Sequence, residues 1–141
     1  MPSAALSFSH PVRIYWEDTD AGGIVYYANY LKFFERARTE WLRALGFAQQ
    51  RLRDEQGLIF VVTDTQVRYL HPARLDDELS VTVALAEAAG ASLTLAQAAL
   101  RGTTLLADGR ITLACVEAQS FRPRRLPQSI LDALASHNRK P

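Results

Sequence analysis

The stretch NYLKFFERARTEWLRAL, residues 29–45, decides how the rest of the 141-residue sequence is interpreted. Its apolar residues recur with the spacing i, i+3, i+4, i+7, which is typical of one face of an α-helix. Gly46 follows directly, as expected for a glycine that ends a helix. The stretch therefore predicts one long amphipathic helix. Its apolar face, which is mostly aromatic, consists of Tyr30, Phe33, Phe34, Ala37, Trp41, Ala44 and Leu45.

Strand patterns lie on both sides of this helix. Upstream, residues 11–17 alternate and are rich in β-branched and aromatic residues, which predicts a strand. Downstream, residues 47–56 predict a short polar helix that Gly57 closes. Alternation then continues in segments that we expect to be strands. These are residues 58–70 (one long strand or two in succession), 79–86, 91–101 and 110–121.

Short turns join the later strands. Ala88-Ala89-Gly90 and Ala107-Asp108-Gly109 are compact enough for hairpins, and residues 129–136 predict a short terminal helix. Long antiparallel strands with one dominant helix indicate an α+β fold in which a curved sheet wraps a single apolar helix. The length is that of one domain, so residues 1–141 are expected to form a single unit.

Composition excludes several classes of partner. The net charge of +1 provides no overall field that would attract nucleic acid or an anionic membrane. No segment has the ~18 apolar residues of a membrane span, and the first ten residues do not match a secretory signal. Cys115 is the only cysteine, lies in an apolar strand pattern and is expected to be a buried thiol. A cytoplasmic location is expected.

The residues before the helix, WEDTDAGGIVYYANY (16–30), have an unusual composition, with Glu17, Asp18 and Asp20 followed directly by Gly22 and Gly23. One interpretation is structural: the aspartates make side-chain turns or helix caps, and the glycines adopt positive φ. A metal site is disfavoured, because the carboxylates do not have calcium-loop spacing and no Cys/His cluster suits zinc. No metal or cofactor is therefore expected.

A third interpretation is catalysis by one carboxylate. If Asp20 lies just before the helix, backbone N–H groups around Tyr27 and Ala28 are available to hold a developing oxyanion. A carboxylate beside them can attack a carbonyl or activate water as general base. A Ser-His or Cys-His pair is harder to build, since His71 lies in an expected turn and no G-x-S-x-G motif is present.

The same residues resemble a known family. Arg13-Ile14, followed after four residues by TDAGGIVYYANY (19–30), resembles the signature of the 4-hydroxybenzoyl-CoA thioesterase family, which has the hotdog fold. FERARTEWLR (34–43), PARLDDEL (72–79) and RPRRLPQSI (122–130) are similar to the bacterial branch of acyl-CoA thioesterases associated with the Tol-Pal system. The resemblance therefore extends over most of the chain.

The resemblance implies a five-stranded antiparallel sheet wrapped around the long helix, in a homodimer joined edge to edge or a homotetramer. It implies an acyl-CoA substrate, a catalytic carboxylate at Asp20 and a backbone amide at Tyr27 that polarises the thioester carbonyl. Coenzyme A would lie along the dimer interface, with its phosphates near basic side chains. Tyr26 and Tyr30 are candidates for the apolar wall of the substrate site.

Two features depart from the resemblance. The Tol-Pal branch usually has histidine at the position of Tyr27, whereas the 4-hydroxybenzoyl-specific enzymes have tyrosine there. Residues 87–92 also lack the basic run that some relatives use for coenzyme A phosphates. The replacement candidates are three arginines, whose alternative role is a solvated basic patch. They are Arg122, Arg124 and Arg125.

The leading hypothesis is an acyl-CoA thioesterase in which Asp20 acts as nucleophile or general base, and the sequence leaves both mechanisms open. The alternative is a hotdog protein that binds an acyl carrier protein or an envelope-associated partner with little turnover. A dehydratase acting on 3-hydroxyacyl chains is disfavoured, because the helix and the loop before it contain no histidine. The acyl group, whether short aliphatic, aromatic or long, is also left open.

Overall fold

The computed structural model describes residues 8–138, which form one antiparallel sheet and three α-helices. The strands are β1 (Phe8–Arg13), β2 (Leu58–Tyr69), β3 (Glu78–Ala89), β4 (Ser92–Arg101) and β5 (Thr104–Glu117). The helices are α1 (Asn29–Ala44), α2 (Gln49–Gln56) and α3 (Gln128–Asn138).

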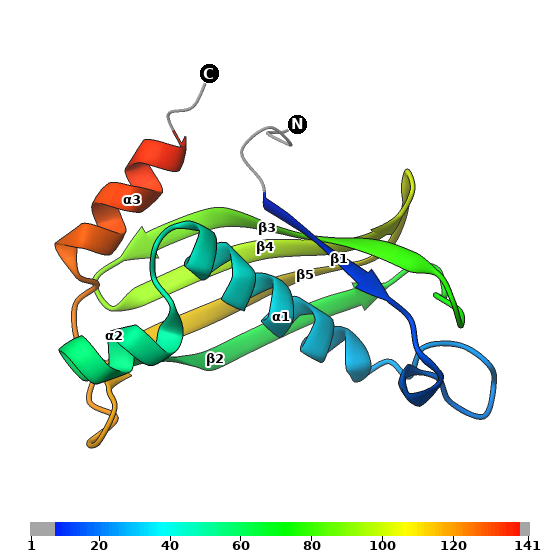
Figure 1. Ribbon diagram of the computed structural model, residues 1–141, viewed down its shortest axis with the longest axis horizontal. Coiled ribbons are helices and arrows are strands. Elements are labelled where there is room, and N and C mark those ends of the chain that lie inside the picture. The colour runs from blue at the N-terminus through cyan, green and yellow to red at the C-terminus, as the bar shows by residue number, and fades with distance from the viewer. Residues whose placement is uncertain (1–7, 139–141) are drawn as a thin grey trace.

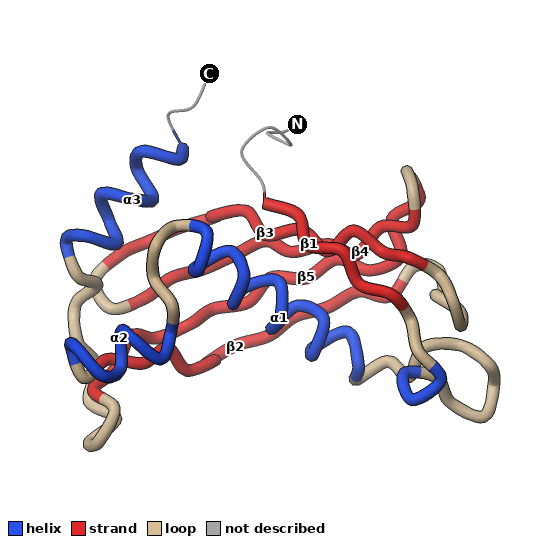
Figure 2. Tube along the Cα trace, viewed as in Figure 1, coloured by secondary structure: helices blue, strands red, loops and turns tan. Residues whose placement is uncertain are grey.

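The sheet has five strands in the order β1-β3-β4-β5-β2, and every pairing is antiparallel. Helix α1 lies across one face of this curved sheet, as Figures 1 and 2 show. Strands β1 and β2 are the two edges. The expected α+β architecture, a five-stranded sheet around one long helix, is therefore confirmed.

Burial of the aromatic face of α1 forms the centre of the core. Phe33, Phe34 and Ala37 are fully buried against apolar residues of the sheet such as Val81 and Leu95. Removing each of the two phenylalanine side chains from water stabilises the fold by roughly 1.5–3 kcal/mol. The helix ends as predicted, with Gly46 at φ +98°.

The buried face of α1 also includes residues that the apolar pattern did not predict. Leu42 is buried, whereas Ala44 is exposed. Arg38 is buried as well and donates to the Gln97 side chain from Nη1 at 3.0 Å. Gln97 in turn donates to the Phe34 carbonyl at 3.0 Å, so the amide links the helix to β4. Burial lowers the pKa of the Arg38 guanidinium.

Three predictions about the strands need correction. The first strand ends at Arg13, because residues 16–18 form a short 3₁₀ helix. Ala107-Asp108-Gly109 lies inside β5 rather than in a turn, and the chain reverses instead at Gly102, which has φ +64°. The last strand ends at Glu117, before residue 121. Residues 58–69 form one long strand, as one of the two alternatives for residues 58–70 predicted.

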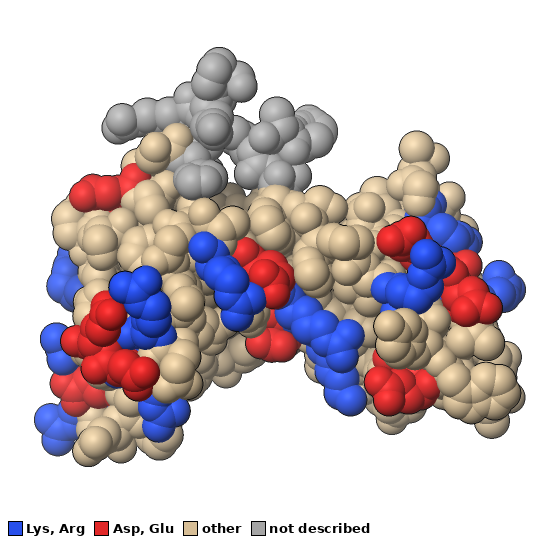
Figure 3. Space-filling model, in the orientation of Figure 1, with Lys and Arg blue, Asp and Glu red and all other residues tan. Residues whose placement is uncertain are grey.

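Charged side chains of both signs are mixed on the surface that Figure 3 shows. On the face drawn in Figure 3, basic and acidic side chains are interspersed, so that face presents no large area of a single sign. No helix among residues 8–138 has both the length and the apolar character needed to span a membrane. Cys115 is fully buried as expected, and burial raises the pKa of its thiol.

Candidate active site

The acidic, glycine-containing stretch folds into a narrow hairpin between β1 and α1. The Asp20 N–H donates to the Ile24 carbonyl and the Gly23 N–H donates to the Asp20 carbonyl, both at 2.9 Å. A bridge between Thr19 and Val25 closes the hairpin below them. Gly23 has φ +82°, a conformation that residues with a Cβ rarely adopt.

Asp18 holds the two ends of this hairpin together. Its carboxylate is only 5% exposed and accepts the Tyr15 N–H at 2.8 Å and the Asn29 side-chain amide at 2.9 Å. The end of the segment after β1 is thereby fixed to the first residue of α1. Asp18 therefore orients the loop, and Arg13 pairs with Glu78 at 3.4 Å.

Asp20 differs from Asp18 in being exposed at the tip of the hairpin. Its Oδ1 accepts the Gly22 N–H at 2.9 Å, which is the side-chain turn that the structural interpretation predicted. Within residues 8–138, its Oδ2 accepts no hydrogen bond. The turn therefore orients the carboxylate and leaves one oxygen available for chemistry.

The start of α1 supplies backbone donors beside the hairpin. The N–H groups of Asn29, Tyr30 and Leu31 donate to the carbonyls three residues before them. Among the described residues, the N–H groups of Tyr27 and Ala28 donate to no acceptor. Free amides at the positive end of a helix dipole are suited to stabilise an oxyanion.

Aromatic rings cover this end of the helix. The Tyr27 ring lies 5.1 Å from the Tyr26 ring and 5.9 Å from the Tyr69 ring, measured between centroids. Tyr26, Tyr27 and Tyr69 are 47%, 61% and 46% exposed, so their rings form an accessible apolar surface. Tyr30 is 3% exposed, and its ring packs against the Tyr69 ring, with the two ring centroids 5.5 Å apart.

Tyr69 is the residue of this cluster that the sequence did not indicate. It ends β2 and reaches α1 only through the fold, so no local pattern marked it. Burial, and secondly the neighbouring Tyr27, raise the pKa of Tyr69.

The three predicted arginines lie at the other end of the sheet. Arg124 donates to Glu117 at 2.8 Å, and Glu117 pairs with Leu58 at the beginning of β2. Tyr69 ends the same strand, about 36 Å away for eleven residue-to-residue steps of ~3.3 Å each. Figure 1 shows the segment after β5 and the loop before α1 at opposite ends of the sheet. One chain therefore does not bring Arg122, Arg124 and Arg125 to Asp20.

Known proteins share this architecture and sequence. Residues 14–134 match the thioesterase-like superfamily. The "Acyl-CoA thioesterase YbgC" of Haemophilus influenzae is 47% identical over 123 residues, covering 87% of this chain and 90% of the relative. The "Acyl-CoA thioester hydrolase YbgC" of Escherichia coli is 46% identical over 125 residues, covering 88% of this chain and 92% of the relative.

A solved structure agrees. The crystal structure of a probable thioesterase from Bartonella henselae is 34% identical, with a TM-score of 0.81, and covers 86% of this chain and 99% of its own. These matches confirm the hotdog fold and the bacterial acyl-CoA thioesterase branch that the sequence motifs resemble. The chain therefore belongs to the thioesterase-like superfamily.

Proposed function

We propose that the protein hydrolyses an acyl-CoA thioester to the free acid and coenzyme A. The observation that carries the proposal is that the hairpin and the helix start that follows it supply an exposed carboxylate at Asp20 and, within residues 8–138, amides at Tyr27 and Ala28 that donate to no acceptor. The relatives named as acyl-CoA thioesterases, 46–47% identical over most of the chain, support the substrate class.

The arrangement suits two routes for acyl transfer. In the first, Oδ2 of Asp20 attacks the thioester carbonyl and displaces coenzyme A as a thiolate, which takes a proton from water. A further water then cleaves the resulting anhydride to the free acid and the Asp20 carboxylate. In the second, Asp20 takes a proton from a water that attacks the carbonyl directly, the C–S bond breaks, and the departing coenzyme A thiolate takes up that proton. In both, negative charge develops on the carbonyl oxygen, and the Tyr27 N–H donates to it. Because this donor is a backbone group, it is independent of the tyrosine side chain.

The tyrosine surface is the proposed wall of the acyl site. Tyr26, Tyr27 and Tyr69 present rings beside the helix start, where the acyl group of a thioester polarised by Tyr27 would lie. Tyr30 was also predicted to contact substrate, but its ring is almost fully covered, so we assign it a supporting role beneath Tyr69.

A dimer is proposed to complete the site with the partner's arginines. Strand β2 is a sheet edge whose middle is exposed, and an edge of this length is available for antiparallel pairing with a second copy. Such pairing about the middle of β2 sets the beginning of one β2 beside the end of the other. The partner's basic cluster then lies next to Tyr69, where it is suited to bind coenzyme A phosphates.

The first experiment measures thiol release from a panel of thioesters by the wild type and by the Asp20→Asn variant. The panel contains short aliphatic, long aliphatic and 4-hydroxybenzoyl-CoA. We expect hydrolysis of at least one of these by the wild type and its loss in the variant. Binding of acyl-CoA without turnover by the wild type would instead favour the acyl-carrier or envelope-partner hypothesis.

Removing two arginines is expected to weaken substrate binding without affecting chemistry. Among residues 8–138, Arg122 and Arg125 form no ion pair, whereas Arg124 is engaged with Glu117. We expect the Arg122→Ala/Arg125→Ala variant to raise KM for acyl-CoA about 5- to 10-fold with kcat unchanged, as loss of two exposed charge-assisted contacts implies. A thioester that lacks the nucleotide serves as the comparison, because its KM should not change. Arg43→Ala/Arg51→Ala, which removes two exposed positive charges from α1 and α2, is the matched charge control.

Mixed dimers test whether the arginines act on the partner's site. Asp20→Asn protomers are co-expressed with Arg122→Ala/Arg125→Ala protomers under different tags, and the heterodimer is purified through both tags. If the arginines serve the opposite site, one site of each heterodimer is intact and the wild-type KM returns. A KM as high as that of the arginine variant would contradict this proposal.

The remaining expectations stay predictions. They are a cytoplasmic location, an association with the Tol-Pal system, an acyl carrier protein as a further partner, and the choice between dimer and tetramer.

A further inference from the structure

The hairpin that carries Asp20 is attached to a neighbouring segment, residues 72–77, which connects β2 to β3. The Val25 N–H donates to the Ala73 carbonyl at 2.9 Å. Ile24 forms an isolated bridge with Arg74. The return arm of the hairpin therefore lies directly against this segment.

The chain that leads from β1 towards the hairpin contacts the same segment through Ile14. The Ile14 N–H donates to the Asp77 carbonyl at 2.9 Å, and the Ile14 carbonyl accepts the Asp76 N–H at 3.0 Å. Within the described chain, residues 14–28 make backbone hydrogen bonds to no other distant segment. The position of the hairpin thus depends on how firmly residues 72–77 are held.

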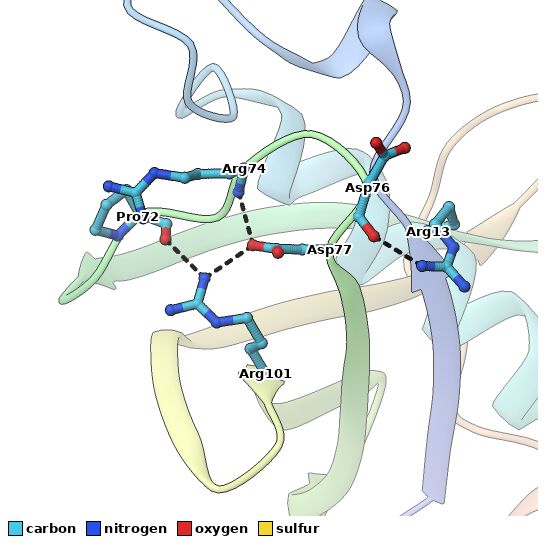
Figure 4. A network of polar contacts seen from close by, with 6 residues as sticks. All are labelled: Arg13, Pro72, Arg74, Asp76, Asp77 and Arg101. Carbon is cyan, nitrogen blue, oxygen red and sulfur yellow. Dashed lines mark hydrogen bonds and ion pairs between the residues drawn. The ribbon is translucent and has the colours of Figure 1, made fainter.

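A single guanidinium nitrogen holds both ends of that segment, as Figure 4 shows. Nη1 of Arg101, at the end of β4, donates to Oδ2 of Asp77 at 2.8 Å and to the Pro72 carbonyl at 3.2 Å. The same Oδ2 also accepts the Arg74 N–H at 2.8 Å. Arg101 and Asp77 therefore clamp the segment from its first residue to its last.

The clamp lies in partly buried surroundings. The side chains of Arg101 and Asp77 are 36% and 23% exposed, so water competes less with this ion pair than with the pairs on the helices. Partial burial opposes ionisation of Asp77, but hydrogen bonds from the Arg74 N–H and Arg101, together with both positive charges, lower the pKa of its carboxyl. A second tie, from Arg13 Nη1 to the Asp76 carbonyl at 2.7 Å, secures the other side.

We infer that Arg101 and Asp77 are positioning residues for the thioesterase site, acting through residues 72–77 to fix the hairpin that carries Asp20 and leads to Tyr27. The inference rests on the proposed function. Neither residue belongs to the acidic-glycine motif, and each acts at a distance through backbone hydrogen bonds. A shift of about 1 Å in a reacting group can reduce turnover by as much as 10²-fold, so a loosened hairpin is expected to affect chemistry more than binding.

The first pair of variants changes Arg101. Arg101→Met keeps most of the side-chain length without a donor, and we expect kcat to fall about 10-fold or more with KM within about 2-fold of the wild type. Arg101→Lys retains one charged nitrogen, and one nitrogen makes both contacts in the native clamp. We therefore expect Arg101→Lys to recover most of the lost kcat.

The second pair changes Asp77. Asp77→Ala removes the acceptor for Arg101 and for the Arg74 N–H, and should reduce kcat as Arg101→Met does. Asp77→Asn keeps an oxygen that can accept both, so it should retain kcat much better. The double variant Asp77→Ala/Arg101→Met is expected to be no worse than either single variant, since both remove the same clamp.

Amide hydrogen exchange at Val25 gives a readout that does not depend on turnover. Loss of the clamp should make this amide exchange about 10-fold faster or more, because its acceptor, the Ala73 carbonyl, is no longer held. Arg43→Met, which removes an exposed ion pair with Glu40 on α1, is the control and should change neither exchange nor kcat. Should Arg101→Met fail to fold, Asp77→Ala provides the same measurements.

The outcomes separate this inference from the proposed function. An unchanged Val25 exchange rate in Arg101→Met would overturn the clamp, whether or not the protein hydrolyses thioesters. A lower melting temperature with wild-type kcat would also overturn it, since that is the effect of a purely stabilising ion pair. The proposed function is tested independently by wild-type hydrolysis and by Asp20→Asn.

Discussion

Replacing Asp20 by asparagine is expected to lower kcat for acyl-CoA hydrolysis by about 10²-fold or more, the usual contribution of a catalytic nucleophile or base. An amide neither attacks a thioester nor accepts a proton from water at a useful rate. The substitution keeps an oxygen that can accept the Gly22 N–H, so the turn at the tip of the hairpin should persist. KM should change little. Thiol release at saturating substrate is the measurement.

The control for this variant lies three residues away. Glu17→Gln removes the same charge from the same stretch, and the Glu17 side chain is exposed and forms no ion pair within residues 8–138. We expect its kcat to stay close to that of the wild type. Equal losses in both variants would mean that negative charge in the loop matters generally, and they would remove Asp20 from its proposed role.

The two routes open to Asp20 differ in where solvent oxygen goes. In a single turnover in ¹⁸O-labelled water, direct attack by water puts the label in the released acid. An anhydride that water cleaves at the Asp20 carbonyl puts the label in Asp20 itself, and mass spectrometry of the peptide detects it. Label in Asp20 would establish the nucleophilic route.

Much of the site was predictable because it is local in sequence. Asp20, the glycines and the helix start lie within a few residues of one another, so turn chemistry and the helix boundary together indicated a carboxylate beside free amides. The structure adds that Asp18 and Asn29 hold this arrangement through a partly buried hydrogen bond. The spacing of the two aspartates alone did not show that Asp18 is buried and orients the loop whereas Asp20 stays exposed.

The parts that the sequence did not predict are brought together by the fold. Tyr69 reaches Tyr27 from the end of β2, and Arg101 reaches Asp77 from the end of β4. Neither contact leaves a periodic signal in the sequence. Each joins residues that are far apart along the chain and meet only at one end of the folded sheet. The distance between the arginines and Asp20 also depends on strand register, which a one-chain pattern does not contain.

The fold was predicted from periodicity, and the main error of that prediction is the turn expected at Gly109. Ala107-Asp108-Gly109 has the composition of a turn, yet Gly109 pairs with Gln97 and Val67 inside the sheet. Its φ is not positive, so conformational freedom does not explain the glycine. A Cβ placed there would lie 3.2 Å from Cε2 of Phe34 and 3.1 Å from the Gln66 carbonyl. The glycine allows α1 to approach the sheet closely, a requirement that only the packed structure reveals.

Gly109→Val is therefore expected to destabilise the protein by about 1–3 kcal/mol, the usual cost of overpacking a core. Added methyl groups must displace the Phe34 ring, and with it the helix that begins beside Tyr27. The measurement is the urea midpoint at one fixed protein concentration, since association would shift it. Ala96→Val, at an exposed position of the neighbouring strand β4, is the control and should be near neutral, because valine is favoured in strands.

Equal midpoints for the two variants would mean that the sheet yields at Gly109 without cost. If adding Phe34→Leu to Gly109→Val partly restores the urea midpoint, the Phe34 ring is the group that clashes with the valine, because the smaller leucine relieves that contact.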